Sequence, residues 1–117
     1  KSLVDFIKQK KTISICFPRN INNYEKFVDN VNPDIISIDY NVNPSIIRDT
    51  IDIPIQGGLD PKILLQSKEN VRNEVTKYLK TFEKKRYIFN LGHGVLPETN
   101  PDMVKYLVDE VRSFNGQ

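Results

Sequence analysis

The chain has 117 residues, 38% hydrophobic and 27% charged, which is ordinary for one globular unit with a buried core. A formal net charge of +2 is too small to imply a polyanionic partner, and so we expect no nucleic acid. Because no apolar run approaches the roughly 20 residues of a membrane span and no signal-peptide pattern opens the chain, we expect no membrane contact and a cytoplasmic location. Cys16 is the single cysteine, which excludes an internal disulfide and fits a reducing compartment.

The first residues form an amphipathic helical pattern, with Leu3, Phe6 and Ile7 on one face. Four short apolar runs follow, and each is rich in isoleucine and aromatic residues, as buried strands are. These predicted strands span residues 12–17, 34–40, 53–58 and 86–92.

Helical patterns lie between and after the strands, and they predict one apolar face each. The inward residues are expected to be Tyr24, Phe27, Val28 and Val31 in 22–31, Ile46, Ile47 and Ile51 in 44–51, Val71, Val75, Tyr78, Leu79 and Phe82 in 67–82, and Val104, Leu107, Val108, Val111 and Phe114 in the last helix.

Helix start signals are clear at three places. Asn100 is a good N-cap and Pro101 fits the first helical position, where its missing N–H costs nothing. The stretch Leu59–Pro61 repeats this cap-then-proline arrangement, and Ser67 is available as the N-cap of the third helix.

Strands that alternate with helices predict an α/β fold with parallel strands, because parallel neighbours need a crossover connection. We treat residues 1–117 as a single α/β unit. The pattern itself leaves two topologies open, a small doubly wound sheet or half of a (β/α)8 barrel.

In both topologies ligands bind where strands end and helices follow. The residues at these strand ends are Pro18, Arg19, Asn20, Asp39, Tyr40, Asn41, Gln56, Gly57, Gly58, Asn90, Gly92, His93 and Gly94. One histidine and one strand cysteine are too few ligands for zinc, so we expect no metal site. Neither a Walker sequence nor GxGxxG is present, and Cys16 is better explained as a small core residue than as a nucleophile paired with His93.

His93 is the only histidine, and a lone histidine elsewhere would most simply hydrogen-bond its own loop. Between two glycines at a strand end, it is instead a candidate ligand contact, and we expect Gly92 and Gly94 to clear space beside it. Arg19 either binds a carboxylate or phosphate or lies solvated in its loop. Asp39 either caps the following turn or orients a ligand.

Two motifs, "IQGGLDP" at 55–61 and "YIFNLGHGVLPETNPDMVKYLVDEVR" at 87–112, closely resemble the carboxyl-terminal part of the uroporphyrinogen decarboxylase family. "ISICFPRN" at 13–20 and "IISIDYNV" at 35–42 fall where that family has strand ends, so the resemblance covers nearly the whole chain. It implies that these strands are the last four of a (β/α)8 barrel and that the chain is a piece of a longer protein.

The resemblance also implies a cofactor-free lyase that converts the four acetate arms of uroporphyrinogen III to methyls, giving coproporphyrinogen III in haem biosynthesis, commonly as a homodimer. His93 matches the histidine that lines the porphyrinogen cleft, with Arg19 a further candidate substrate contact and Gly57, Gly92 and Gly94 as backbone turns near the site. The family's catalytic aspartate matches no residue of this chain, so we expect no activity from this piece alone. The chain departs from the family at Asn20, commonly glycine, and at Gly58, usually asparagine, where we expect altered loops.

Two alternatives remain. A corrinoid-dependent methyltransferase of the same barrel superfamily would need a His-x-Cys zinc pair, which the sequence lacks. A non-catalytic, self-associating α/β module from a split or decayed gene would use the unpaired edges that half a barrel exposes.

Overall fold

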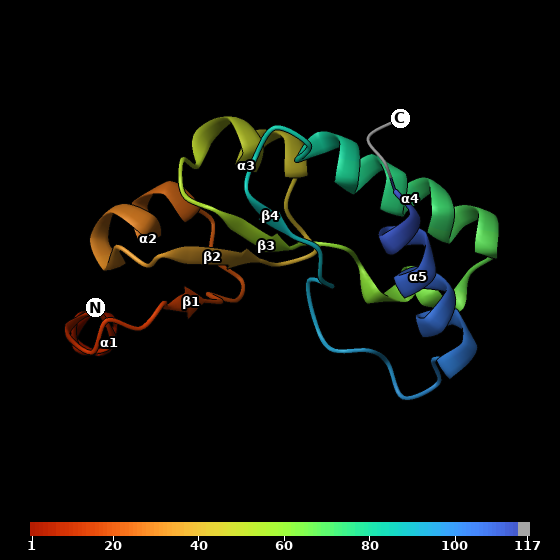
Figure 1. The fold of residues 1–117 in the computed structure, drawn as a ribbon, viewed down its shortest axis with the longest axis horizontal. Coiled ribbons are helices and arrows are strands. Elements are labelled where there is room, and N and C mark those ends of the chain that lie inside the picture. The colour runs from red at the N-terminus through yellow and green to blue at the C-terminus, as the bar shows by residue number, and fades with distance from the viewer. Residues whose placement is uncertain (115–117) are drawn as a thin grey trace.

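A computed structural model describes residues 1–114, in which helices alternate with the strands of one sheet (Figure 1). The predicted α/β class is confirmed. The elements in chain order are α1 (Ser2–Gln9), β1 (Ile15–Cys16), α2 (Tyr24–Val31), β2 (Ile35–Ile38), α3 (Pro44–Thr50), β3 (Ile55–Gly57), the 3-10 helix η1 (Pro61–Leu65), α4 (Lys68–Thr81), β4 (Tyr87–Ile88) and α5 (Pro101–Ser113).

All four strands are parallel, and their order in the sheet, β1-β2-β3-β4, is their order in the chain. A doubly wound sheet reverses its strand order at a switch point, whereas a barrel adds each strand beside the previous one. The observed order is therefore that of a barrel segment. The sheet is not closed, and within the described chain β1 and β4 form its two edges.

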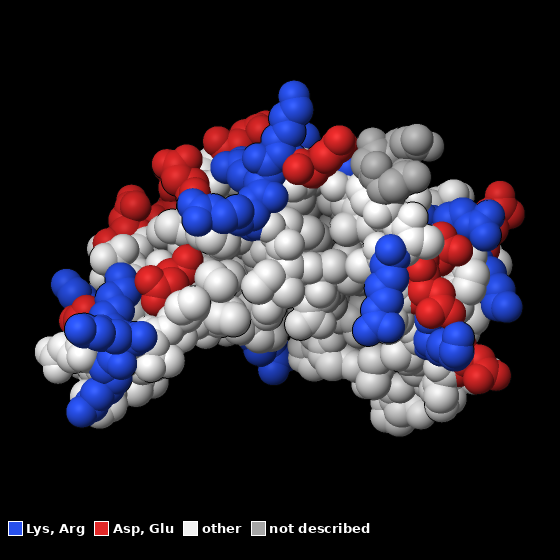
Figure 2. All heavy atoms as spheres, viewed as in Figure 1, with Lys and Arg blue, Asp and Glu red and all other residues white. Residues whose placement is uncertain are grey.

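The strand register divides the side chains between two faces. Ile36 pairs with Cys16 on one side and Ile55 on the other, and Ile55 pairs with Tyr87, so these residues share a face. This face carries the hydrophobic core against the helices, which contribute Tyr24, Ile47, Val71, Val75, Tyr78, Phe82 and Leu107. The opposite side of the sheet is concave, and Figure 2 shows few charged side chains there. We call this side, which carries Ser37, Gln56 and Ile88, the arched face.

The amino ends of β1 and β2 are joined by a compact hydrogen-bond group. The Asp34 carboxylate accepts from the Ser14 backbone N–H at 2.8 Å and from the Ser14 hydroxyl at 3.0 Å. The Asp34 N–H in turn donates to Ser14 Oγ at 3.1 Å. These bonds lower the pKa of Asp34, the backbone bond contributing most.

The predicted start signals are confirmed. The Asn100 side chain accepts from Asp102 N–H with Pro101 first in α5, and the Ser67 side chain accepts from Asn70 N–H at the start of α4. Asp60 caps η1 by accepting from the Lys62 N–H. These features depend on adjacent residues only, and so they are readable without the fold.

The predicted strands are longer than the observed ones, because ladder bonds form only where neighbouring strands overlap in register. Two helical residues that were predicted to face the core, Ile46 and Val108, do not. Ile46 is 60% exposed and Val108 is 37% exposed, since no described element packs over them. The apolar face of α1 is likewise open, with Leu3 and Phe6 exposed and Val4 buried instead. No helix within residues 1–114 has the length and apolar character needed to cross a membrane.

Candidate functional site

A row of side chains crosses the arched face of the sheet. Ser37 pairs with Gln56 and Gln56 pairs with Ile88, so all three point away from the helices. The same register extended by one residue places Phe17 level with Ser37. The row therefore has a polar centre, Ser37 and Gln56, between two apolar ends.

This row forms part of a cavity of about 480 Å³ at the carboxyl ends of the strands. Its lining consists of Ile15, Phe17, Ser37, Gln56, Asn90, Leu91, His93 and Gly94. Four predicted strand-end positions, Gln56, Asn90, His93 and Gly94, thus meet in one space, as expected for loops at the same edge of a parallel sheet. The Gln56 Nε2 group donates to Ser37 Oγ at 3.3 Å.

His93 lies on the loop that follows β4, is exposed to solvent and lines the cavity. The loop is fixed just before it by the Gly92 N–H, which donates to the Leu59 carbonyl at 2.7 Å, next to a bridge between Leu59 and Leu91. His93 therefore follows an anchored backbone and lines the cavity.

The two glycines beside His93 have different roles. A Cβ on Gly92 would lie 2.5 Å from Tyr40 N and 2.9 Å from the Asp39 carbonyl carbon, so this position is closed by the neighbouring backbone. The expectation that Gly92 clears space for a ligand is wrong, because the loop after β2 occupies that space. A Cβ on Gly94 would meet nothing within 4 Å, and Gly94 does line the cavity.

The Gly57–Gly58 turn at the end of β3 is held from the helix side. Both glycines have positive φ, +88° and +102°, a conformation that favours glycine. The Tyr87 hydroxyl donates to the Gly57 carbonyl at 2.6 Å, and the Tyr78 hydroxyl donates to the Gly58 carbonyl at 2.8 Å. Burial raises the pKa of Tyr87 and raises that of Tyr78 to about 12, so both remain donors. The turn is thus closely held despite glycine at position 58.

Asp39 is 3% exposed, and its carboxylate stabilises the loops that follow β1 and β2. Its carboxylate accepts from the Tyr40 N–H at 2.8 Å and from the Asn20 N–H at 3.4 Å. Of the two roles considered for Asp39, the structure favours capping. Asn20 has φ of +55°, the left-handed conformation that glycine and asparagine both adopt, so asparagine at this position keeps a glycine-like backbone.

Arg19 is exposed and does not line the cavity that His93 lines. Cys16 lies on the helix side of the sheet, half-buried against the core, and burial raises the pKa of its thiol. A Cys16–His93 pair is therefore not formed, because the two side chains belong to opposite faces. Among residues 1–114 no three His, Cys, Asp or Glu side chains lie together as metal ligands would.

Ser37 and Phe17 line the cavity but were not among the strand-end residues predicted from the sequence. The alternation of side chains along a strand was the available signal: Ser37 is two residues before Asp39 in an otherwise isoleucine-rich run.

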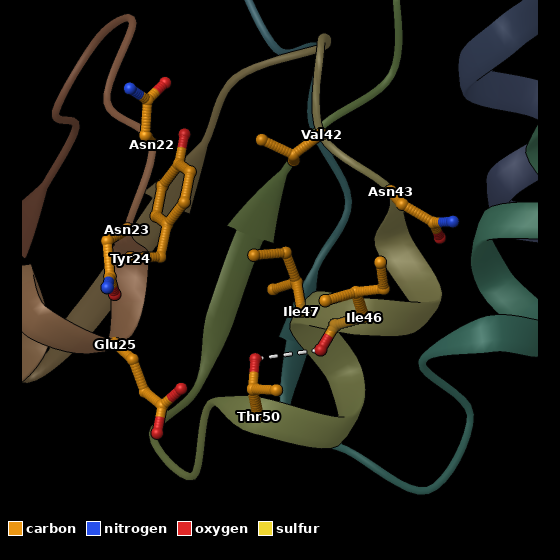
Figure 3. A pocket seen from close by; sticks show the side chains of 9 residues that line it. All are labelled: Asn22, Asn23, Tyr24, Glu25, Val42, Asn43, Ile46, Ile47 and Thr50. Atoms are coloured by element: carbon orange, nitrogen blue, oxygen red, sulfur yellow. Dashed lines mark hydrogen bonds between the residues drawn. The ribbon is translucent and has the colours of Figure 1, made fainter.

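A second hollow of about 280 Å³ lies on the helix side, between α2 and α3 (Figure 3). Three asparagines, Tyr24, Glu25, Thr50 and three apolar side chains line it, and Thr50 Oγ donates to the Ile46 carbonyl. It contains none of the predicted site residues, so the cavity beside His93 remains the candidate site.

Successive parallel strands, each followed by helix, with polar groups gathered at their carboxyl ends, define an α/β protein of the barrel type. The model of the family described as Uroporphyrinogen decarboxylase (URO-D) matches residues 1–114, and the chain belongs to this family.

Curated relatives carry the same description. The uroporphyrinogen decarboxylase of Rickettsia felis is 42% identical over 102 residues, which cover 86% of this chain and 30% of that protein. The uroporphyrinogen decarboxylase of Rickettsia canadensis is 41% identical over 106 residues, or 89% of this chain and 31% of the relative. The chain thus spans about 30% of the length of the curated relatives it matches.

Proposed function

We propose that the whole protein removes the acetate carboxyl groups of uroporphyrinogen III, giving coproporphyrinogen III, and that this chain supplies one wall of the substrate cleft. The observation that carries the proposal is the cavity at the carboxyl ends of the strands, where His93 and Gln56 meet in a chain of the uroporphyrinogen decarboxylase family. Ligand sites of barrel enzymes lie at this end of the strands.

His93 is the substrate contact in this proposal. The substrate is a polycarboxylate, and His93 is the only cavity-lining residue of the described chain that can carry a positive charge. Its imidazole binds an acetate carboxylate or passes a proton to the carbon that loses carbon dioxide. A protonated pyrrole ring accepts the electron pair left by the departing carboxyl group, so the reaction as proposed needs no cofactor or metal.

This wall is incomplete as a catalytic site. Arg19 lies outside the cavity and the Asp39 carboxylate is engaged by backbone N–H groups, so among residues 1–114 no carboxylate lines the cavity with His93. We therefore assign residues 1–117 to a single α/β unit that is the carboxyl-terminal part of a longer barrel, and expect it to be inactive alone. The complete protein is proposed to be a cytoplasmic homodimer.

The test is anaerobic decarboxylation of uroporphyrinogen III by the full-length protein, with His93→Ala compared against Lys80→Ala. Lys80 is exposed on α4, on the other side of the sheet, and serves as the matched surface control. We expect kcat/KM to fall at least about tenfold for His93→Ala, the scale of a lost charge-assisted contact, and to stay unchanged for Lys80→Ala.

Two results would count against the proposal. An inactive full-length protein would favour the non-catalytic, self-associating alternative. Full activity of His93→Ala would remove the role given to His93 while leaving the reaction intact.

A further inference from the structure

The Asp39 carboxylate joins two of the loops at the carboxyl ends of the strands. Its Oδ1 atom accepts from the Tyr40 N–H at 2.8 Å in the loop after β2, and its Oδ2 atom accepts from the Asn20 N–H at 3.4 Å in the loop after β1. The residue is 3% exposed, and within residues 1–114 these backbone N–H groups are the donors to its carboxylate. Burying a charge costs free energy, and charge-assisted hydrogen bonds offset that cost.

A carboxylate at position 39 does more than a turn cap requires. Asparagine or serine caps a single turn with one oxygen, whereas an ionised carboxylate directs a separate acceptor oxygen to each of two loops. An asparagine side chain here would present an NH₂ group in place of one oxygen, and that group cannot accept from a backbone N–H. The charge of Asp39 therefore ties the loop after β1 to the loop after β2.

The loop that carries His93 packs on the same part of the backbone. A Cβ on Gly92 would lie 2.5 Å from Tyr40 N and 2.9 Å from the Asp39 carbonyl carbon, so Gly92 lies directly against the 39–40 peptide bond. The Asp39 N–H donates to the Tyr24 hydroxyl at 3.0 Å, which holds this strand end from the helix side. The peptide bond against Gly92 thus belongs to a residue that is fixed through both its backbone and its side chain.

We propose that Asp39 is a positioning residue for His93. Its carboxylate fixes the 39–40 peptide bond relative to the loop after β1, and that peptide bond sets the position of the Gly92 backbone and hence of His93 at the cavity. This inference rests on the proposed function, in which His93 contacts the substrate. Asp39 itself does not line the cavity, so it acts through the backbone and does not touch the substrate.

The experiment measures decarboxylation of uroporphyrinogen III by the full-length protein with and without Asp39→Asn, each in the presence of His93 and in a His93→Ala background. Asparagine keeps the size of the side chain and removes one acceptor oxygen. Asp34→Asn is the matched control, because Asp34 is also a carboxylate that accepts from a backbone N–H, but at the amino ends of β1 and β2. Thermal unfolding verifies that each variant is folded, with Asp39→Ser as a second variant should Asp39→Asn fail.

We expect Asp39→Asn to lower kcat/KM about three- to tenfold, with the same division between KM and kcat as His93→Ala shows. In the His93→Ala background the same substitution should change kcat/KM less than about twofold, because no imidazole is left to position. Asp34→Asn should leave kcat/KM unchanged in both backgrounds. A substitution that only destabilised the fold would act alike with and without His93.

Either of two results in a folded variant would overturn the inference. One is a kcat/KM for Asp39→Asn or Asp39→Ser equal to that of Asp34→Asn, and the other is a loss as large without His93 as with it. In both cases the proposed function stands if the unmodified protein decarboxylates uroporphyrinogen III and His93→Ala impairs it. If the unmodified protein does not decarboxylate this substrate, the proposed function fails and this inference with it.

Discussion

Gly92 and Gly94 differ in their surroundings although they flank the same histidine. Gly92 is packed against the backbone of residues 39–40, whereas Gly94 faces open space. The sequence predicted one shared role for the pair because both are glycines at a strand end. The distinction depends on the loop after β2, which approaches from another part of the chain, and no local pattern reveals that contact.

Gly92→Ala is expected to destabilise the protein by about 1–3 kcal/mol, since backbone atoms 2.5–2.9 Å from the new Cβ cannot move aside cheaply. Gly94→Ala is the matched control and should stay within about 0.5 kcal/mol. Urea denaturation of both variants measures the free energies of unfolding. Equal stabilities would show that the loops are not packed as described.

The Ser14–Asp34 group predicts a pH dependence. The pKa of Asp34 is lowered in the folded protein, so its stabilising effect is fully present above the unfolded value of about 3.9 and is lost as pH falls through the lower folded value. Asp34→Asn should therefore be less stable than the unmodified protein at neutral pH, with the difference shrinking below about pH 4. Denaturation midpoints from pH 7 down to pH 2 provide the measurement. A difference that persists unchanged at the lowest pH would assign the effect to packing.

Among the elements, the helix starts at Ser67 and Asn100 were predicted correctly because a cap joins residues two or three apart. The outward positions of Ile46 and Val108 were not predicted, since helical spacing defines an apolar stripe but not which of its members a neighbouring element covers. Ser37 was visible as a polar residue within the isoleucine-rich β2, but isoleucines lie on both faces of this strand, so the sequence did not show that Ser37 lines the cavity.

Strand β4 and helix α4 together hold the β3 turn through two tyrosine hydroxyls. Tyr87 also stacks on Phe82 with ring centroids 4.4 Å apart, and that contact survives the loss of the hydroxyl. Tyr87→Phe and Tyr78→Phe should each cost about 1 kcal/mol, the net value of one hydrogen bond. Tyr40→Phe, at an exposed tyrosine, is the control and should be neutral. Guanidinium denaturation tests this, and equal stabilities of all three variants would contradict it.

For the molecule as a whole, the parallel class and barrel-like order followed from the alternation of elements and the resemblance. The open arch did not follow from periodicity, because periodicity marks strands and helices but does not show whether a sheet closes. Ile13, Ile15, Phe17 and Ile88 consequently remain exposed on the arched side or at its margin.

The 117-residue chain produced by itself is expected to self-associate through this apolar face and its two unpaired edges. Sedimentation velocity should show species larger than the monomer, and the double substitution Phe17→Glu, Ile88→Glu should shift them toward monomer by placing charges on the face. A chain that sediments as a monomer across a wide concentration range would contradict this prediction.

The Ser14–Asp34 group lies at the amino ends of β1 and β2, whereas Asn90, His93 and Gly94 of the cavity follow the carboxyl end of β4. Barrels commonly separate stability from chemistry in this way. For protein engineering, the amino ends of β1 and β2 are therefore a region where the sequence can be redesigned for heat tolerance, guided by melting temperature, while the loop after β4 that lines the cavity is left unchanged.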